Sequence, residues 1–150
     1  MAKNTILQSL NDSDNVADLN SSNRRQVQTF IAGAAISAND AVALDLSESD
    51  DSDKALKVIL LDTDASTSQI FVGIALEAAA AAGDNVQVCI SGLCEGNVNG
   101  SAVANSMLVA GATGGRLAIA HATNNAQLCA ICTEADSTNV ATVFVLRQGY

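Results

Sequence analysis

The stretch IFVGIALEAAAAAGDNVQVCISG, residues 70–92, decides between a helical and a β fold. Residues 70–77 and 86–91 alternate branched and other side chains with period two, which is typical of strands. The alanines at 78–82 favour helix by propensity, but five residues are too few for a stable helix alone. The Gly-Asp-Asn tripeptide that follows stops any helix. The stretch therefore predicts two strands joined by an alanine-rich connection, with room for one helical turn.

The same texture extends toward the N-terminus. Strand-like apolar runs alternate with polar segments, and the acidic segment SESDDSDK (47–54) and the segment DTDASTS (62–68) are interpreted as a loop and a turn. The runs that we interpret as strands in this half are VQTFIA (27–32), the apolar end of AISANDAVALDL (35–46) and ALKVILL (55–61).

The second half of the chain repeats this plan. SAVANSMLVAG (101–111) resembles AISANDAVALD (35–45), and GRLAIAHA (115–122) follows a Gly-rich turn as ALKVILL follows the acidic loop. Further along, AQLCAICTEA (126–135) matches QIFVGIALEA (69–78). The last match is of NVATVFVLRQ (139–148) with NVQVCISG (85–92). This alignment places Asn105 over Asn39 and Glu134 over Glu77, with the two blocks joined near LCEGNVNG (93–100). We predict one all-β domain over residues 27–150, a compact β-barrel or β-sandwich of short strands with two related halves.

Residues 1–26 are polar and rich in Asn, Asp and Ser, which predicts an extended N-terminal arm outside the β-domain. Two interpretations stay open, a disordered tail and an arm that lies on a partner or a neighbouring subunit. In the second case the candidate partner-binding residues are Ile6, Leu7, Leu10, Arg24 and Arg25.

Composition restricts the possible functions. The chain of 150 residues carries a net charge of −9, so its surface repels phosphate and a nucleic-acid partner is not expected. No stretch approaches the roughly 20 apolar residues of a membrane helix, and MAKNTILQSLNDSDN lacks the apolar run of a signal peptide. We therefore expect synthesis in a cytoplasm and no membrane. Aromatic residues are only 3%, and such a core is expected to gain stability by self-association.

The search for chemistry yields no catalytic constellation, and we expect no enzyme, no cofactor and no metal. Cys89, Cys94, Cys129 and Cys132 are interpreted as buried free thiols, because residues three apart in a strand such as LCAIC point to opposite faces. His121 lacks a nucleophile partner in the sequence pattern. The acidic residues Asp50, Asp51 and Asp53, with Glu48 nearby, could hold calcium, although a solvated loop is the better interpretation. Residues 111–115, GATGG, are typical of a hairpin turn.

Four short pieces of the sequence form a recognisable pattern, namely Asn39-Asp40, Val42 to Asp45, Val72 to Glu77 and Gly83 to Val88. In these pieces the chain resembles the capsid decoration, or cement, proteins of tailed phages, and the resemblance extends over residues 27–148. The second block departs from this pattern, because Ala130 is aligned with Gly73 and Thr133 is aligned with Leu76.

The resemblance implies a β-domain that binds the outer surface of an icosahedral phage head. Such a protein would clamp neighbouring major capsid protein subunits, with a homotrimer as the expected assembly and the virion as its location. The alternative is a β-barrel binding module of a head fibre or a surface-attachment protein. A sugar site of such a module would stack aromatic rings, and this chain has three Phe and one Tyr.

Overall fold

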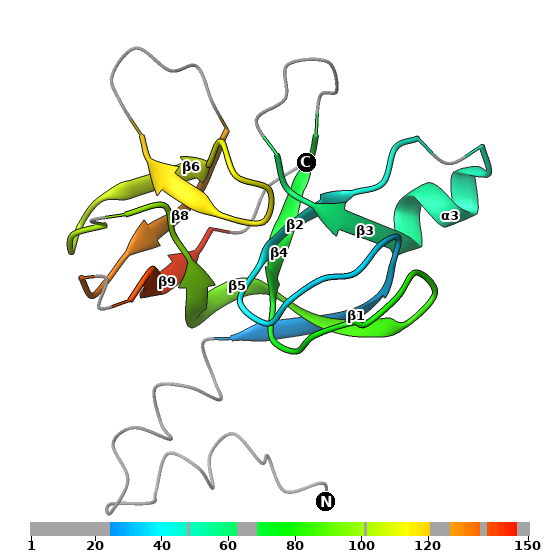
Figure 1. Ribbon diagram of the computed structural model, residues 1–150, viewed down its shortest axis with the longest axis horizontal. Helices are drawn as coiled ribbons and strands as arrows, with labels where there is room; N and C mark the ends of the chain where they lie inside the picture. Colours follow the sequence, from blue (N-terminus) through cyan, green and yellow to red (C-terminus); the bar gives the residue numbers. More distant parts are fainter. Residues whose placement is uncertain are drawn as a thin grey trace, which may run out of the picture.

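The structure, a computed structural model, describes residues 25–47, 49–62, 69–100, 102–120, 127–135 and 138–146. The fold is all-β, as the sequence predicts, with one short helix among the described residues (Figure 1). The strands are β1 (Gln26–Ala32), β2 (Ala41–Leu44), β3 (Lys57–Leu60), β4 (Phe71–Ala75), β5 (Asn85–Asn97), β6 (Met107–Ala110), β7 (Leu117–Ile119), β8 (Leu128–Cys132) and β9 (Val140–Val145), and the helix is α3 (Asp51–Leu56).

Five strands close the first barrel. They are hydrogen-bonded in the order β1-β3-β2-β4-β5, and β1 pairs again with β5 to complete the ring. The pairing of β1 with β3 is parallel, and the other four pairings are antiparallel. Closure leaves no long strand edge of this barrel unpaired, which protects it from edge-to-edge association.

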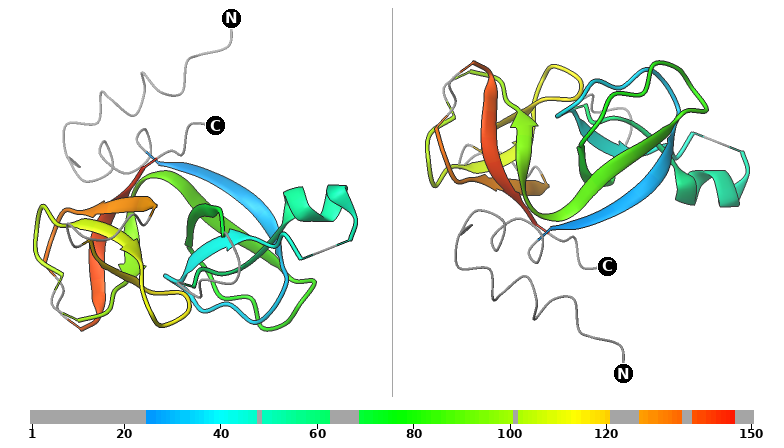
Figure 2. Two further views of the ribbon diagram at one scale, coloured as in Figure 1. Left: turned by 90° about the horizontal axis from the view of Figure 1, so that it is seen from above. Right: turned by 90° about the horizontal axis from the view of Figure 1, so that it is seen from below.

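The 13-residue strand β5 is shared with a second barrel. Its N-terminal half pairs with β1 and β4, and its C-terminal half, Gly92 to Asn97, pairs with β9. From β9 the order continues β8-β6-β7, and a parallel bridge from Val98 to Leu117 returns to the end of β5. Figure 2 shows the two barrels side by side with β5 running from one to the other. Residues 93–100, predicted as a join, therefore lie mostly within a strand.

The two barrels have the same strand register, which confirms the predicted duplication. The predicted alignment of the last strands is wrong by one residue, because Ile74 pairs with Cys89 and Ile131 pairs with Phe144, so that Phe144 and not Val143 is the counterpart of Cys89. Val42 pairs with Gly73 in the first barrel and Leu108 pairs with Ala130 in the second, and each pair is followed by a register shift. The turn before each of these strands contains an asparagine in the left-handed region, with φ of 69° at Asn39 and 70° at Asn105. Asparagine tolerates this conformation better than other non-glycine residues.

The aligned glutamates Glu77 and Glu134 also play matching roles. Oε1 of Glu77 accepts a hydrogen bond from the backbone N–H of Gln87 at 3.1 Å, and Oε2 of Glu134 accepts one from the hydroxyl of Thr142 at 3.2 Å. In both barrels the acid thus ties the end of one strand to the strand that follows it. The repeated glutamate is therefore a structural element of each barrel.

The alanine-rich connection forms no helix, as the opening stretch predicts. Ala79 exchanges two backbone hydrogen bonds of 2.9 Å with Ile36, which makes it an isolated β-bridge. The chain then reverses through Gly83, whose φ of 94° suits glycine. The segment packs Ala79 into the first barrel with 3% of its surface exposed.

The acidic segment 47–54 was predicted as a loop and residues 55–61 as a strand, and both boundaries are wrong. A helical turn, α3, runs from Asp51 to Leu56, and β3 begins only at Lys57. The first turn is acidic and Lys54 lies in the last turn, an arrangement that complements the helix dipole. Asp53 and Lys57 form an ion pair of 3.1 Å across this boundary. A pattern of strand-forming residues could not reveal these local charge interactions.

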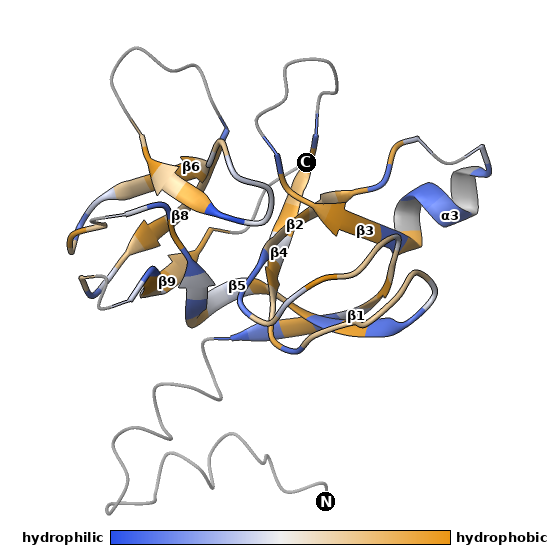
Figure 3. Cartoon of the chain, in the orientation of Figure 1, coloured by the Kyte–Doolittle hydropathy of each residue, from blue (hydrophilic) through white to orange (hydrophobic). Residues whose placement is uncertain are grey.

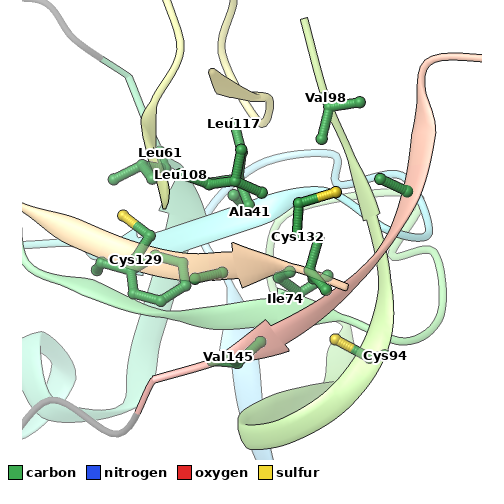
Figure 4. Packing of buried hydrophobic residues seen from close by; sticks show 14 of the residues in the cluster. Ala41, Leu61, Ile74, Cys94, Val98, Leu108, Leu117, Cys129, Cys132 and Val145 are labelled. Carbon is green, nitrogen blue, oxygen red and sulfur yellow. The ribbon is translucent and has the colours of Figure 1, made fainter. Parts of the chain in front are cut away.

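The buried residues form two clusters. One fills the first barrel and includes Phe30, Val42 and Val58. The other combines the interior of the second barrel with residues that the first barrel turns outward, so that one layer joins the two (Figure 4). Its members include Ala41, Ala43, Leu61, Phe71 and Ile74 from the first barrel and Leu108, Leu117, Cys132 and Val143 from the second.

Ile74 is one of the residues that pack between the two barrels. In the duplicated register Gly96 stands where Phe30 fills the first barrel, so the second barrel has no side chain of its own at that position. The Cδ1 of Ile74 lies 2.9 Å from the place where a Cβ on Gly96 would be. A side chain of the first barrel therefore packs against the glycine where the second barrel lacks a side chain of its own.

Candidate functional site

Most of the predicted contact residues of the arm lie outside the described part of the chain. These are Ile6, Leu7, Leu10 and Arg24, and the same holds for His121 and Glu48. Arg25 is described, and it is exposed immediately before β1. Strand β1 takes in Gln26, so the β-domain begins one residue inside the predicted arm.

The acidic candidates are now placed on or beside α3. The backbone carbonyl of Asp50 accepts hydrogen bonds of 3.1 Å from the N–H groups of Asp53 and Lys54, and the carboxylate of Asp53 pairs with Lys57. Asp51 begins the helix. In the described ranges no three His, Cys, Asp or Glu side chains gather in a way that could hold a metal ion.

All four cysteines are free thiols and buried, as the sequence predicts. The sulfur atoms of Cys129 and Cys132 point to different parts of the core in Figure 4. Each donates a hydrogen bond to a backbone carbonyl, Cys129 to Gln127 at 3.3 Å and Cys132 to Glu134 at 2.8 Å. Burial raises the pKa of Cys129 to about 12. The hydrogen bond with Cys89, together with burial, raises the pKa of Cys94.

These pKa shifts predict a loss of stability in alkali. The folded state keeps the proton on Cys129 at pH values where the unfolded thiol, with an ordinary pKa of 9.0, has lost it. The contribution of this thiol is complete below pH 9.0 and declines as the pH rises toward about 12. We expect the free energy of unfolding to fall across this window in urea titrations, and less steeply in Cys129→Ala. A thiol reagent at pH 8 should label the cysteines only after unfolding, and rapid labelling of the native protein would contradict buried thiols.

The two barrels are joined by a polar contact around Asp40. Its side chain is 9% exposed and accepts two hydrogen bonds of 2.8 Å, one from the backbone N–H of Ser37 and one from the side-chain amide of Asn97. The backbone N–H of Asn97, on the shared strand, donates to the carbonyl of Asn39 at 2.8 Å. The turn before β2 is therefore fixed to the C-terminal end of β5.

A turn of the second barrel completes this contact. Gly115 accepts a hydrogen bond from the backbone N–H of Ala41 and donates one to the carbonyl of Leu61, both at 2.8 Å. Its φ is 76°, and a Cβ at this position would lie 2.9 Å from the Cγ of Asp40. The predicted hairpin turn at 111–115 thus has a specific role, because only glycine allows the turn to reach the first barrel.

Replacing Asp40 by alanine is expected to destabilise the fold by about 1–3 kcal/mol, since the half-buried amide of Asn97 and the backbone N–H of Ser37 lose their acceptor. Ser106 occupies the duplicated position in the second barrel. Ser106→Ala is the matched control and should cost less than about 0.5 kcal/mol. Denaturant midpoints measure both variants, and equal losses would show that the Asp40 contact contributes little.

A shallow polar cleft of about 410 Å³ lies beside this contact. It is lined by Asn39, Glu95, Glu134, Thr142 and four neighbours, and the lining holds no Lys, Arg, His or Cys. The side-chain amide of Asn39 approaches Glu95 at 3.5 Å, and Glu134 is held by Thr142. The lining therefore offers carboxylates, one amide and hydroxyls to a polar partner.

Sequence reasoning missed three features of this region, which are the shared strand, the Asp40–Asn97 contact and the packing of Ile74 against Gly96. The last two join residues more than 20 positions apart. The one available signal was the duplication itself, because its departures mark where the barrels meet. Asp40 is aligned with Ser106 in the sequence, and the strand register adds that Gly96 stands where Phe30 would be. Both differences fall at the junction.

No described helix is long and apolar enough to cross a membrane. No protein-family profile matches the sequence, and no curated protein matches it. Among solved structures, the chain is similar to the head fibre gp8.5 N base of bacteriophage phi29, with a TM-score of 0.54 and 14% identity. The match covers 84% of this chain and 98% of that one. At this identity the likeness establishes a shared fold.

Proposed function

We propose that the chain is a structural protein of a tailed-phage virion, located on the outer surface of the head. In this proposal it stabilises the capsid by clamping neighbouring major capsid protein subunits, as a homotrimer. The observation that carries the proposal is the double barrel, a fold shared with a phage head fibre base over 98% of that chain. No enzymatic activity is part of the proposal.

The rigidity of the double barrel supports a clamp. Two barrels that share a continuous strand and one buried layer cannot hinge freely about each other. A clamp must hold two attachment points at a fixed separation, and a preorganised body loses less entropy on binding than a flexible one. Many such contacts over a lattice add up to a large collective resistance, because each clamp makes its second contact intramolecularly.

The proposed contact element is the arm with Ile6, Leu7, Leu10, Arg24 and Arg25. Arg25 is exposed at the start of β1, where the arm leaves the first barrel. On a chain with a net charge of −9, an arginine pair is the natural attachment point for an acidic surface.

Deletion of residues 1–24 tests this element while leaving β1 intact. We expect circular dichroism and the melting temperature of the domain to stay unchanged, and binding to phage heads to be lost. A milder control, Arg24→Ala with Arg25→Ala, should weaken binding most at low salt, because the contribution is electrostatic. Full binding after the deletion would remove the arm from the proposal.

The alternative is that the chain forms the base of a head fibre or of a surface-attachment protein. The structural match favours it directly, because the similar chain is the base of a head fibre. The two proposals share a location on the head and differ in what the protein does there. A clamp stabilises the shell, whereas a fibre base only anchors an appendage.

One experiment separates the two. Phage heads that lack the protein are mixed with the purified chain, and both binding and the temperature of head disruption are measured. A clamp raises the disruption temperature in step with occupancy. A fibre base binds at saturable sites and leaves the temperature unchanged. Failure of the chain to bind heads at any concentration tested would overturn both proposals.

A further inference from the structure

Comparison of equivalent positions in the two barrels shows that an outer surface of the second barrel is exposed, whereas its counterpart in the first barrel is buried. In the first barrel, Ala41 pairs with Ile74, which pairs with Cys89, so these residues form one row across three strands. All three are 0% exposed. The second barrel covers this row, through Gly115 at Ala41 and through Gly96 at Ile74.

The same row exists on the second barrel with larger side chains. Met107 pairs with Ile131, Ile131 pairs with Phe144, and Phe144 pairs with Leu93 on the shared strand. We call these four residues the apolar row. Cross-strand partners lie close on one face of a sheet, so the row is a continuous strip over β6, β8, β9 and β5. Figure 3 shows hydrophobic residues along β6, β8 and β9.

The apolar row is accessible to solvent. Met107 is 57% exposed, and Ile131, Phe144 and Leu93 are half-buried. Ala41, the counterpart of Met107, is 0% exposed. A methionine with more than half of its surface in water, beside an isoleucine, a phenylalanine and a leucine, is an exposed patch of the kind that marks an interaction site.

We propose that the apolar row is the surface on which a second copy of this chain docks. The counterpart row in the first barrel is already covered by a barrel of this same fold, so the occupant that fits this geometry best is another such barrel. Charge supports the choice, because the row has no ionisable side chain on a chain of net charge −9. Contact through the row therefore buries apolar area, with the exposed Glu95 at its edge, two residues from Leu93 on β5.

This inference deepens the proposed function, since a trimeric clamp needs a self-contact surface, but it makes no use of the capsid. A heterologous contact, in which two different surface patches of the chain meet, generates a closed ring or an open array. A trimer is the closed form that the proposed function expects. Docking on the row supplies that contact without requiring any residue of the arm.

The test compares Met107→Glu and Phe144→Glu with a control of similar exposure, Leu46→Glu, in the first barrel. Leu46 is 44% exposed and follows β2, away from the row. Sedimentation at micromolar concentration should show an oligomer for the wild type and for Leu46→Glu. Met107→Glu should raise the dissociation constant at least about tenfold, the factor that corresponds to 1.4 kcal/mol. Circular dichroism establishes that each variant is folded, and Met107 is the safer site because it is the more exposed.

A wild type that sediments as a monomer at this concentration overturns the inference. So does a pair of folded row variants with unchanged assembly, a result that would point to the capsid or to residues 1–24 as the occupant. Head binding by the same variants is measured separately. A monomeric Met107→Glu that still binds heads leaves the proposed location standing, and an intact oligomer that binds no head overturns the proposed function alone.

Discussion

Replacing Gly73 by alanine is expected to destabilise the protein by more than about 3 kcal/mol, at the upper end of overpacking effects. A Cβ at Gly73 would lie 2.1 Å from the backbone carbonyl oxygen of Cys89 and 2.8 Å from Cγ1 of Val88. Real Cβ atoms do not come so close, and the nearest obstacle is backbone rather than a flexible side chain. Strand β5 would have to move away from β4 at the point where it crosses to the second barrel.

The duplication supplies the control for Gly73. Ala130 occupies the same register position in the second barrel, pairs with Val145 on β9 and is 0% exposed. A methyl group is therefore accommodated in one barrel and excluded from the other. Ala130→Gly should cost only about 1 kcal/mol, from the added freedom of glycine and the lost methyl. Equal effects of Gly73→Ala and Ala130→Gly in denaturant unfolding would refute the close approach of β5.

Replacing Ile74 by alanine should cost about 2–5 kcal/mol, the range for a large buried aliphatic side chain. Ile74 is 0% exposed and packs beside Gly96, so the cavity would open in the layer that joins the barrels. Unfolding followed by fluorescence or circular dichroism measures the loss. A value under about 1 kcal/mol would mean that the barrels separate without much penalty.

A double-mutant cycle tests the contact of Ile74 with Gly96 itself. Gly96→Ala alone places a methyl group 2.9 Å from Cδ1 of Ile74 and 3.2 Å from Cγ2 of Val143. Ile74→Val removes Cδ1 and relieves the first of these contacts. The double variant should therefore be more stable than the sum of the two single losses predicts, by about 0.5–3 kcal/mol. Simple additivity would show that the two residues do not touch in solution.

Much of the architecture could be predicted from local sequence. The period of two in residues 70–77 and 86–91 predicts strands, and β4 and β5 lie there. Glycine and asparagine positions predict the turns, and Gly83, Asn39 and Asn105 have positive φ values. These features need only neighbouring residues, since the side-chain alternation and the left-handed region are properties of a few adjacent dihedral angles.

Local charge interactions explain the part of the strand map that was wrong. Residues 55–61 are strand formers by composition, yet Asp53 and Lys57 pair across the first of them and α3 extends to Leu56. Strand-forming propensity contributes little free energy per residue, so a hydrogen-bonded helical turn whose end charges complement its dipole replaces the strand at residues 55–56. The boundary therefore moved by two residues while the strand itself remained.

Strands and turns could be inferred from the amino-acid order, because each depends on residues close together in the chain, and the repeat could be inferred by comparing segments of the two halves. Three features required the folded chain, namely that β5 belongs to both barrels, that Asp40 binds Asn97 and that Ile74 packs against Gly96. The tertiary structure also decided which copy of the repeated row is covered, with Ala41 buried and Met107 in water. The physical reason is that burial depends on how the two barrels pack together, and a duplicated pattern specifies both copies of a surface without specifying which copy is covered.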